Sequence, residues 1–312
     1  MSRRKRALKF IDAKKQFGLE IGPLVSPIVT KKMGDIVYAD HASTEELQKK
    51  YSKDPNIDES KIVDITYVLG SKTLPEAVGA ETFFDYVIAS HVIEHVPNLI
   101  GWLDEIFSIL KPGGVLSLMI PDKRFTFDIR RRCTNIVDVV DAHIHQLKKP
   151  SPRHVYDHFS NFMEVDCHKV WAEGNTGLAK MADNNPGTGL DMALNSFVSD
   201  HYYDSHCWVF TPYSFFELLK DMASIDLFQF EVIDFNDTNN NEFEFYVSLK
   251  KPIEAQQKDK SHIINSIPVL PEPDIRCGIE YFQTSQTQKN KVSTTHSAPS
   301  EPKNSWNPFK RA

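Results

Sequence analysis

The sequence lacks long apolar runs and an excess of positive charge. No apolar segment approaches the roughly 18 residues that a helix needs to span a bilayer. The basic residues 1–6 are not followed by the apolar segment of a secretory signal. Lys and Arg total 36 against 42 Asp and Glu, a net charge of −6, which disfavours binding to nucleic acid through phosphate contacts. We therefore expect no membrane span and no nucleic-acid partner.

Cysteine is also scarce, with four residues in a chain of 312. None forms a CxxC pair, since the four are widely spaced: Cys133, Cys167, Cys207 and Cys277. A chain of this length with 41% hydrophobic residues can bury a sizeable core without disulfides. Reduced thiols in a cytoplasmic protein are the expected state.

Regular patterning is missing from residues 251–312. This segment is rich in Gln, Lys, Ser, Thr and Pro and has few apolar clusters, so it cannot bury enough surface to offset its ordering entropy. The sequence predicts a mostly disordered tail over 251–312. The short apolar stretch 263–270 is the part that could dock onto the body.

Before residue 251, strand-like and helix-like segments alternate. The clearest helix is predicted at 99–110, where Leu99, Leu103, Ile106 and Leu110 fall on one face. Other helices are predicted at 44–53, with Thr44 as the N-cap, and at 211–222. Strands are predicted at 18–21, 35–39, 61–68, 84–90 and 115–120, with a final pair at 228–235 and 242–250.

This order predicts an α/β fold. Alternating strands and helices favour a parallel sheet, and the short turn at 236–241 forces the last two strands to be antiparallel. The prediction is a Rossmann-like seven-stranded sheet, mostly parallel with an antiparallel C-terminal hairpin and helices on both faces. Residues 1–122 and 206–250 form this core. Residues 123–205 lack clean periodicity and are predicted to be an inserted lid near the carboxyl ends of the strands, where ligands bind in such sheets.

The loop after the first strand contains few glycines. It reads Leu-Glu-Ile-Gly-Pro-Leu-Val-Ser-Pro over residues 19–27. Pro23, Leu24 and Ser26 stand where a dinucleotide-binding loop needs N–H groups or further glycines, so the loop is badly suited to a pyrophosphate. It can turn beside a cofactor without phosphates, or simply connect two elements.

Carboxylates accompany the next two strands. Asp40 ends the second strand, where it can accept hydrogen bonds from both hydroxyls of a ribose. Alternatively, it caps the following helix. Asp64, near the third strand, could accept from an adenine amine. Together with the loop, these residues favour a nucleoside that has no pyrophosphate.

The segment 84–97 is the most informative motif. It reads Phe-Asp-Tyr-Val-Ile-Ala-Ser-His-Val-Ile-Glu-His-Val-Pro, and Lys-Pro-Gly-Gly follows the next helix at 111–114. This combination resembles class I S-adenosylmethionine-dependent methyltransferases of the type 11-like branch. Glu-Ile-Gly-Pro, with Asp40 and His41, is similar to a subgroup associated with polysaccharide and glycosylation genes. The resemblance covers residues 17–122 well and 206–250 in layout.

The resemblance implies S-adenosylmethionine as the cofactor and methyl transfer as the reaction. Asp40 matches the ribose-binding acid and Asp64 the acid beside the adenine. The positions along the methionine part of the cofactor are matched by Glu20, Gly22, Ser90 and His91. The implied acceptor is a hydroxyl of a saccharide or another small polar molecule.

Histidine is abundant in the middle of the chain, because nine of the 12 lie between His91 and His206. A neutral hydroxyl is a poor nucleophile and needs a base, and imidazole has a suitable pKa. We predict as catalytic residues His206, where the insertion rejoins the core, and His95, in the turn after the fourth strand. The alternative for His95 is a structural role.

Some of these histidines have spacings that suit a metal, namely His143 with His145 and His154 with His158. Asp141, Asp157, Cys167 and His168 are further candidate ligands. No complete zinc signature is present, so we predict a polar, hydrogen-bonding lid and no resident metal.

A basic run starts directly after the fifth strand. Lys123 and Arg124, with the arginines at 130–132, could bind an anionic acceptor such as a nucleotide sugar or an acidic glycan. Alternatively, they form a solvated helix face.

Two other functions fit the same fold. The glycine-poor loop is compatible with a catalytically inactive domain that binds the cofactor or a partner. The histidines are compatible with a metal-dependent enzyme. Cofactor binding with turnover separates an active methyltransferase from the first alternative, and metal content tests the second.

Overall fold

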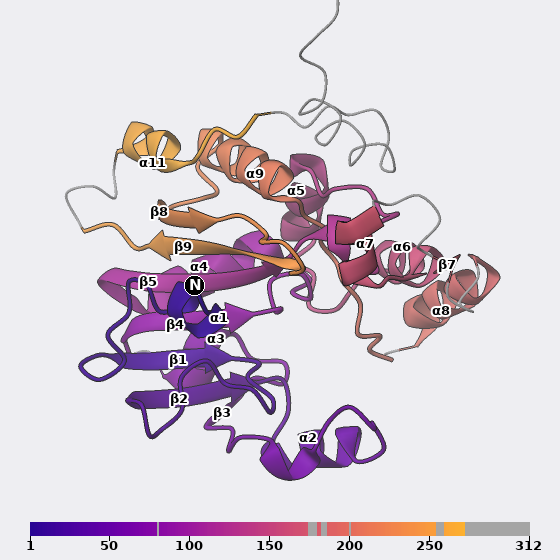
Figure 1. Ribbon diagram of the computed structural model, residues 1–312, viewed down its shortest axis with the longest axis horizontal. Coiled ribbons are helices and arrows are strands. Elements are labelled where there is room, and N and C mark those ends of the chain that lie inside the picture. The colour runs from indigo at the N-terminus through magenta and orange to yellow at the C-terminus, as the bar shows by residue number, and fades with distance from the viewer. Residues whose placement is uncertain (80, 174–179, 182–185, 200, 254–258, 272–312) are drawn as a thin grey trace, which may run out of the picture.

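The computed structural model contains one seven-stranded sheet with helices around it (Figure 1). The structure describes residues 1–79, 81–173, 180–181, 186–199, 201–253 and 259–271. From edge to edge, the strand order is β3-β2-β1-β4-β5-β9-β8. The strands are β1 (Phe17–Ile21), β2 (Asp35–Asp40), β3 (Tyr67–Val68), β4 (Phe84–Ser90), β5 (Leu110–Pro121), β8 (Glu231–Asn236) and β9 (Glu244–Lys250).

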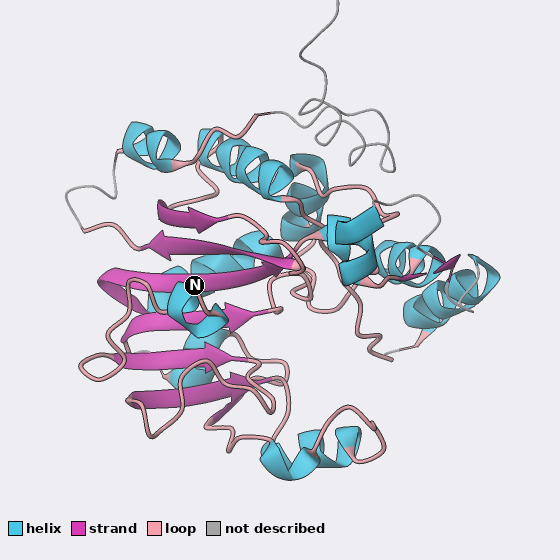
Figure 2. Ribbon diagram, in the orientation of Figure 1, coloured by secondary structure: helices cyan, strands magenta, loops and turns pink. Residues whose placement is uncertain are grey.

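The pairing of these strands confirms the predicted fold class. β1 is parallel to β2 and to β4, and the pairs β2–β3 and β4–β5 are also parallel. β9 is antiparallel to both of its neighbours, β5 and β8 (Figure 2). The carboxyl ends of β1, β2 and β4 therefore meet at one edge, where ligands bind in sheets of this kind.

Side chains at the helix starts satisfy N–H groups that the helices leave free. Asn98 accepts the N–H of Gly101 (3.0 Å) at the start of α4 (Leu99–Ile109). Thr211 accepts the N–H of Ser214 (3.2 Å) at the start of α9 (Pro212–Ser224). The other described helices of the predicted core are α1 (Arg3–Ala7), α2 (Thr44–Tyr51), η1 (Glu59–Lys61) and α3 (Leu74–Val78).

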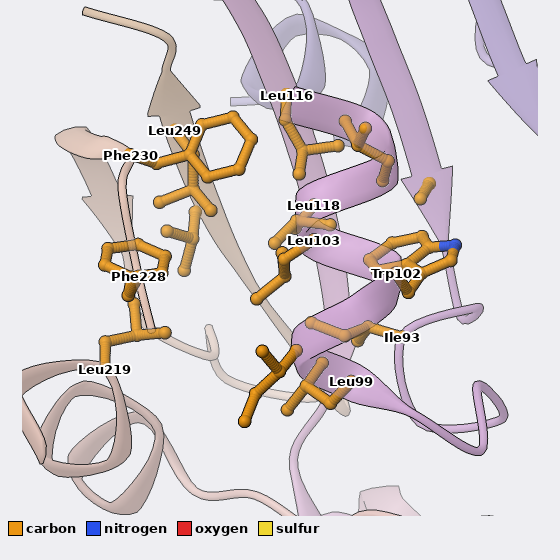
Figure 3. Close-up of a cluster of buried hydrophobic side chains, with 14 of the residues drawn as sticks. Ile93, Leu99, Trp102, Leu103, Leu116, Leu118, Leu219, Phe228, Phe230 and Leu249 are labelled. Carbon is orange, nitrogen blue, oxygen red and sulfur yellow. The ribbon is translucent and has the colours of Figure 1, made fainter. Parts of the chain in front are cut away.

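The apolar face of α4 packs on the sheet. Leu99, Leu103 and Ile106 are at most 3% exposed. Figure 3 shows Leu99 and Leu103 in one cluster with Leu118 of β5 and Phe228. Burial of an aliphatic side chain of this size contributes about 1.5–3 kcal/mol to the stability of the fold. The helical periodicity of 99–110 therefore identifies the surface by which α4 binds the sheet.

The opposite face of the sheet has a different cover. There Tyr86 of β4 packs with Tyr38 of β2, with Ala7 of α1 and with Ile28 from the chain between β1 and β2. Because both faces are covered, β4 is buried on both sides, as the nearly continuous apolar sequence of 84–90 predicts.

Two local predictions are wrong. The third strand covers Tyr67–Val68 rather than 61–68. Of the residues before it, Ile65 donates its N–H to the Thr44 hydroxyl (2.9 Å) rather than to a neighbouring strand. Thr44 is therefore not the N-cap of α2. That cap is Ser43, which forms a capping box with Glu46.

The segment between β5 and α9 leaves and rejoins the core at neighbouring points. Asp122 forms a parallel bridge with Phe210, and Lys123 donates its N–H to the carbonyl of Phe210 (2.9 Å). In Figure 1 most of its helices lie beyond the arrowheads of β1, β4 and β5. That is the predicted place for a lid, and the lid role stays a prediction. The segment contains η2 (Lys123–Phe125), α5 (Ile136–Ile144), α6 (Pro152–Asn161), β6 (Met163–Glu164), α7 (Cys167–Glu173), β7 (Lys180–Met181) and α8 (Pro186–Val198).

Part of the C-terminal segment packs on the core. α11 (Lys260–Ser266) contacts α9 and β8. Its Ile263 and the following Ile267 are 4% and 3% exposed and belong to the main hydrophobic cluster. The stretch predicted to be able to dock is thus in contact with the body. The rest of the tail prediction concerns residues 254–258 and 272–312, which lie outside the described residues.

Two observations concern membrane-spanning helices and the cysteines. Among the described helices, none combines the length and the apolar character that crossing a membrane requires. Cys133, Cys167 and Cys207 are free thiols, and Cys277 lies outside the described residues.

Replacing Ile263 and Ile267 together by Ala should lower the free energy of unfolding by several kcal/mol, because each such change at a buried site costs about 2–5 kcal/mol. Urea unfolding of the full chain measures the effect. Val269→Ala is the matched control, since Val269 is 77% exposed and its truncation should change stability by no more than about 0.5 kcal/mol. Equal stability of the double variant and the control would show that α11 adds nothing to the core.

Candidate active site

A cavity of about 560 Å³ lies where the turn after β4 meets the insertion. The turn contributes His91, Glu94 and His95, and His206 enters from the segment that returns from the insertion. Most of the remaining wall is apolar and includes Phe125, Phe127, Phe162, Met163, Cys167 and Phe243. We refer to this space as the histidine cavity.

His91 has an unusual backbone conformation at the end of β4. Its φ is +54°, in the left-handed region that non-glycine residues rarely adopt, and its N–H donates to the carbonyl of Met119 (3.0 Å). The ring Nε2 lies 2.8 Å from the carboxylate of Glu244. Burial alone would raise the pKa of Glu244, but hydrogen bonds from His91, Arg3 and Tyr246 lower it to about 2. A stable anion therefore holds the His91 ring at the cavity wall.

His206 is paired with a buried aspartate. Its Nδ1 lies 2.6 Å from Oδ2 of Asp128, whose Oδ1 accepts from Arg131 (2.7 Å). Arg131 also donates to the main-chain carbonyl of His206 (2.8 Å) and to Asp157 (2.8 Å). Burial opposes ionisation of Asp128, but His206 and Arg131 hold its pKa well below the usual range. An anionic partner at Nδ1 fixes the tautomer and leaves Nε2 of His206 as the second nitrogen.

His95 has a carboxylate partner of its own. Its Nδ1 lies 2.8 Å from Oδ1 of Asp204, and this hydrogen bond is the main cause that lowers the pKa of Asp204 to about 2. Burial disfavours the imidazolium form of His95, but Asp204 and the negative charge of Glu94 raise its pKa above the ordinary value. The rings of His95 and His206 meet edge to face with centroids 4.6 Å apart. Two carboxylate-paired imidazoles thus stand side by side.

The main chain of Glu94 joins the turn after β4 to the returning segment. Its carbonyl accepts the N–H groups of Cys207 (2.7 Å) and Trp208 (3.2 Å). The Trp208 indole N–H also donates to the carbonyl of Val96 (2.6 Å). These bonds place His206 beside the turn although the two are far apart in sequence.

Glu20 and Gly22 shape the loop after β1. The buried Glu20 carboxylate accepts the N–H groups of Ile28 (2.7 Å) and Val29 (3.1 Å), so it braces the far end of the loop. Burial raises the pKa of Glu20 to about 7 in spite of these two hydrogen bonds. Gly22 has φ +64°, and a Cβ there would lie 3.0 Å from Cγ2 of Val92. The loop therefore packs against the turn that follows β4.

Asp40 lies at the carboxyl end of β2 and is 7% exposed. Its Oδ1 accepts the N–H of His41 (2.7 Å) and lies 2.6 Å from the Nδ1 of that ring. Because Ser43 caps α2, the alternative that Asp40 is the helix cap is wrong. Asp64 is exposed and precedes β3, so it does not occupy the carboxyl end of that strand.

Of the remaining predicted site residues, Ser90 and Arg124 already have protein partners. The Ser90 hydroxyl accepts from Arg3 of α1 (2.5 Å). The Arg124 guanidinium is held by the fully buried Asp122, with Nε 2.9 Å from Oδ2. Lys123, beside it in η2, is half-buried.

The structure brings together only some of the predicted residues. His91, His95 and His206 line the histidine cavity. The other predicted residues are not part of the cavity wall as described: Glu20, Gly22, Asp40, Asp64, Ser90, Lys123 and Arg124.

Sequence reasoning missed three carboxylates at this site. Glu94 stood inside the quoted motif without a role, and Asp204 lies two residues before His206. Asp128 had one local signal, the i, i+3 spacing to Arg131 that allows an ion pair.

The histidine pairs with metal-like spacing do not form a shared donor set. His154 and His158 are buried on α6, where their Nδ1 atoms accept main-chain N–H groups. Burial lowers the pKa of His154 to about 4 and that of His158 to about 3. His143 and His145 contact Asn98 and a main-chain carbonyl separately. Among the described residues, neither pair belongs to a group of three or more candidate ligands.

Comparison with known proteins gives one family match. A family described as a methyltransferase domain matches residues 20–222, whereas no curated protein matches the sequence. A solved S-adenosylmethionine-dependent methyltransferase from Methanosarcina mazei is 14% identical, with 79% of this chain and 96% of that chain covered and a TM-score of 0.40. The magnesium protoporphyrin IX methyltransferase ChlM from Synechocystis PCC 6803, solved with bound cofactor, is 9% identical, with 80% and 76% covered and a TM-score of 0.34.

A third solved structure is matched over a shorter length. The CcbJ methyltransferase from Streptomyces caelestis is 17% identical, with 42% of this chain and 56% of that chain covered and a TM-score of 0.29. This chain therefore spans little more than half of that protein.

The contribution of Glu20 to stability should fall by about 3 kcal/mol as the pH rises from about 4.5 to about 7. The unfolded chain loses this proton near the ordinary glutamate pKa, whereas the folded chain keeps it until about 7. The folded state is thus favoured below this window and loses the advantage above it. Urea unfolding across this pH range would compare the wild type with Glu20→Gln, which cannot titrate. A stability difference between the two that is independent of pH would contradict the raised pKa.

Proposed function

The chain belongs to the methyltransferase-domain family, and from that premise we propose that it transfers a methyl group from S-adenosylmethionine to a hydroxyl of a saccharide or another small polar acceptor. The observation that carries this proposal is the pair of carboxylate-bound imidazoles, His206 and His95, at one cavity beyond the carboxyl end of β4. The likeness of the β1 loop and of Asp40-His41 to a polysaccharide-associated subgroup supports a glycan acceptor.

The residues at the ends of β1 and β2 suit a cofactor with a ribose and no phosphate. Both contacts of Asp40 with His41 use Oδ1, so Oδ2 can accept a ribose hydroxyl. Gly22 lets the loop approach the turn after β4 closely, and we assign the methionine part of the cofactor to this loop together with Ser90 and His91. Asp64 is the candidate for the adenine side. When bound, the cofactor supplies an activated methyl group on its sulfonium.

The histidine cavity suits the acceptor. Phe125, Phe127 and Phe162 provide apolar surface for the faces of a sugar ring, while the imidazoles provide polar contacts for hydroxyls. Its volume of about 560 Å³ lies within the usual range for small-ligand sites. Arg124 is already paired with Asp122 and Asp237. We therefore propose Lys123, rather than Arg124, as the main contact for an acidic acceptor.

His206 is proposed as the general base. The acceptor oxygen forms a bond to the methyl carbon as the carbon–sulfur bond breaks, and sulfur keeps that electron pair as a neutral thioether. The hydroxyl proton passes to Nε2 of His206, and Asp128 stabilises the resulting imidazolium through Nδ1–H. His95, held by Asp204 in the same way, is the second candidate for this proton.

Asp40→Ala should weaken binding of S-adenosylmethionine by roughly 1.5–3 kcal/mol, the size of hydrogen bonds to a charged group. Calorimetry of the folded variant measures the affinity. Asp35→Ala is the matched control, because Asp35 starts the same strand at the opposite edge of the sheet and its loss should leave affinity unchanged. Equal affinity of Asp40→Ala and wild type would refute the ribose assignment.

The reaction can be tested with methyl-labelled S-adenosylmethionine and a panel of nucleotide sugars, neutral and acidic oligosaccharides, and amines. We expect label to enter a hydroxyl-bearing acceptor. Transfer to amines alone would overturn O-methylation. Cofactor binding without transfer to any member would favour an inactive binding domain.

With an acceptor in hand, His206→Ala should lower kcat by about 10²–10⁴-fold while affinity for S-adenosylhomocysteine stays within twofold. His206→Gln repeats the test with a bulkier side chain at this buried site. His145→Ala is the control, because the His145 side chain is 63% exposed and its ring contacts Asp141 of α5, outside the cavity wall. An unchanged kcat would remove the base role from His206 and leave His95 to be tested.

A further inference from the structure

Three side chains that line the histidine cavity have their donor atoms close together. A carboxylate oxygen of Glu94, a ring nitrogen of His95 and a ring nitrogen of His206 all lie within 4.8 Å of one another. Two ligands of one ion, each about 2.1 Å from it, lie roughly 3–4 Å apart. Side-chain rotations that move the donor atoms by about an ångström would therefore let all three bind a single ion.

Glu94 is the least expected member of this group. It is fully buried, and both of its carboxylate oxygens lack a hydrogen-bond partner among the described residues. Nδ1 of His91 lies 3.6 Å from Oε1, which is too far for a hydrogen bond. A buried carboxylate without partners is strongly unfavourable, so this position calls for a cationic ligand.

The two imidazoles are prepared for the same ligand. Each binds a carboxylate through Nδ1, His95 that of Asp204 (2.8 Å) and His206 that of Asp128 (2.6 Å). This is the arrangement in which metal-binding histidines are usually held, because the outer carboxylate fixes the ring and makes the other nitrogen more basic. In both residues that other nitrogen is Nε2.

We propose that Glu94, His95 and His206 bind a divalent first-row transition-metal ion such as Zn²⁺, Mn²⁺ or Co²⁺. Two imidazoles and one carboxylate favour these ions over Mg²⁺ and Ca²⁺, which prefer sets made of oxygen ligands. Three protein ligands leave coordination positions open, as in catalytic metal sites. His91, whose Nδ1 lies 3.6 Å from the same carboxylate, is a further candidate donor.

The ion would change how the acceptor is activated. A hydroxyl bound to an open coordination position has a lowered pKa, so its proton can leave to solvent while His206 and His95 serve as ligands. This chemical role depends on the proposed function. Binding of the ion itself does not depend on it, so the two can be tested separately.

The test is calorimetric titration of the full chain, freed of metal with a chelator, with Zn²⁺, Mn²⁺ and Mg²⁺ each added alone. We expect one Zn²⁺ or Mn²⁺ per chain with a Kd in the micromolar range or below, and much weaker binding of Mg²⁺. Glu94→Gln, which keeps the volume of the side chain and removes its charge, should weaken the binding at least 100-fold. His95→Gln should have a similar effect.

Two further variants separate a metal site from a folding effect. Asp204→Asn acts on His95 from outside the ligand set and should weaken binding about 10–100-fold. The Asp204 and His95 side chains are 51% and 33% exposed, so these variants can be examined even if Glu94→Gln does not fold. His145→Gln, at an exposed histidine, is the matched control and should bind like wild type.

The outcomes are distinct for the two proposals. The metal site is overturned if neither Zn²⁺ nor Mn²⁺ binds, if only Mg²⁺ binds, or if folded Glu94→Gln and His95→Gln bind like wild type. Calorimetry with S-adenosylhomocysteine on the same samples tests the cofactor separately. Metal binding without cofactor binding would support the metal site and refute the proposed function. Cofactor binding without metal binding would refute the metal site and leave the proposed function unaffected.

Discussion

The site depends on one carbonyl group, that of Glu94. By accepting the N–H groups of Cys207 and Trp208, it holds the chain returning from the insertion against the turn after β4. Buried backbone groups must find hydrogen-bond partners. This pairing provides them for two N–H groups of the returning segment and at the same time sets the position of His206. His206 is thereby placed beside His95 although the two are far apart in the sequence.

Most of the buried charges in this region are neutralised by another group. Arg131, whose side chain is 1% exposed, binds Asp128 and Asp157 together, and Asp128 in turn binds His206. Replacing such an ion pair by apolar residues is often neutral or stabilising, so stability alone does not explain it. What the cluster provides is orientation, because it fixes both the ring and the main chain of His206. Among the described residues the Glu94 carboxylate accepts no hydrogen bond, and its ion-pair contact, Nδ1 of His91, is 3.6 Å away. This contrast directs attention to a cation.

The sequence predicted the fold class and the directions of the strands correctly, but it predicted only part of the candidate site. The apolar run at 84–90 and the helical face of 99–110 fix β4 and α4 locally, and their alternation determines the topology. The outer partners Asp128 and Asp204 lie in a segment without clean periodicity, and only the folded insertion brings them to His206 and His95. The length of β3 could not be predicted either, because it depends on the contact of Thr44 with Ile65.

The loop after β1 adopts a tight bend although it lacks the glycines of a dinucleotide-binding motif. Leu24 has φ +45°, a left-handed conformation that costs a non-glycine residue roughly 1–2 kcal/mol. It is held there because its carbonyl accepts the N–H of Val63 (3.0 Å) and because Glu20 binds the N–H groups of Ile28 and Val29. The bend that glycine would permit is thus imposed by hydrogen bonds at both ends of the loop. In this loop Glu20 therefore provides a constraint that glycine does not, and the small number of glycines is not an argument against the proposed cofactor binding.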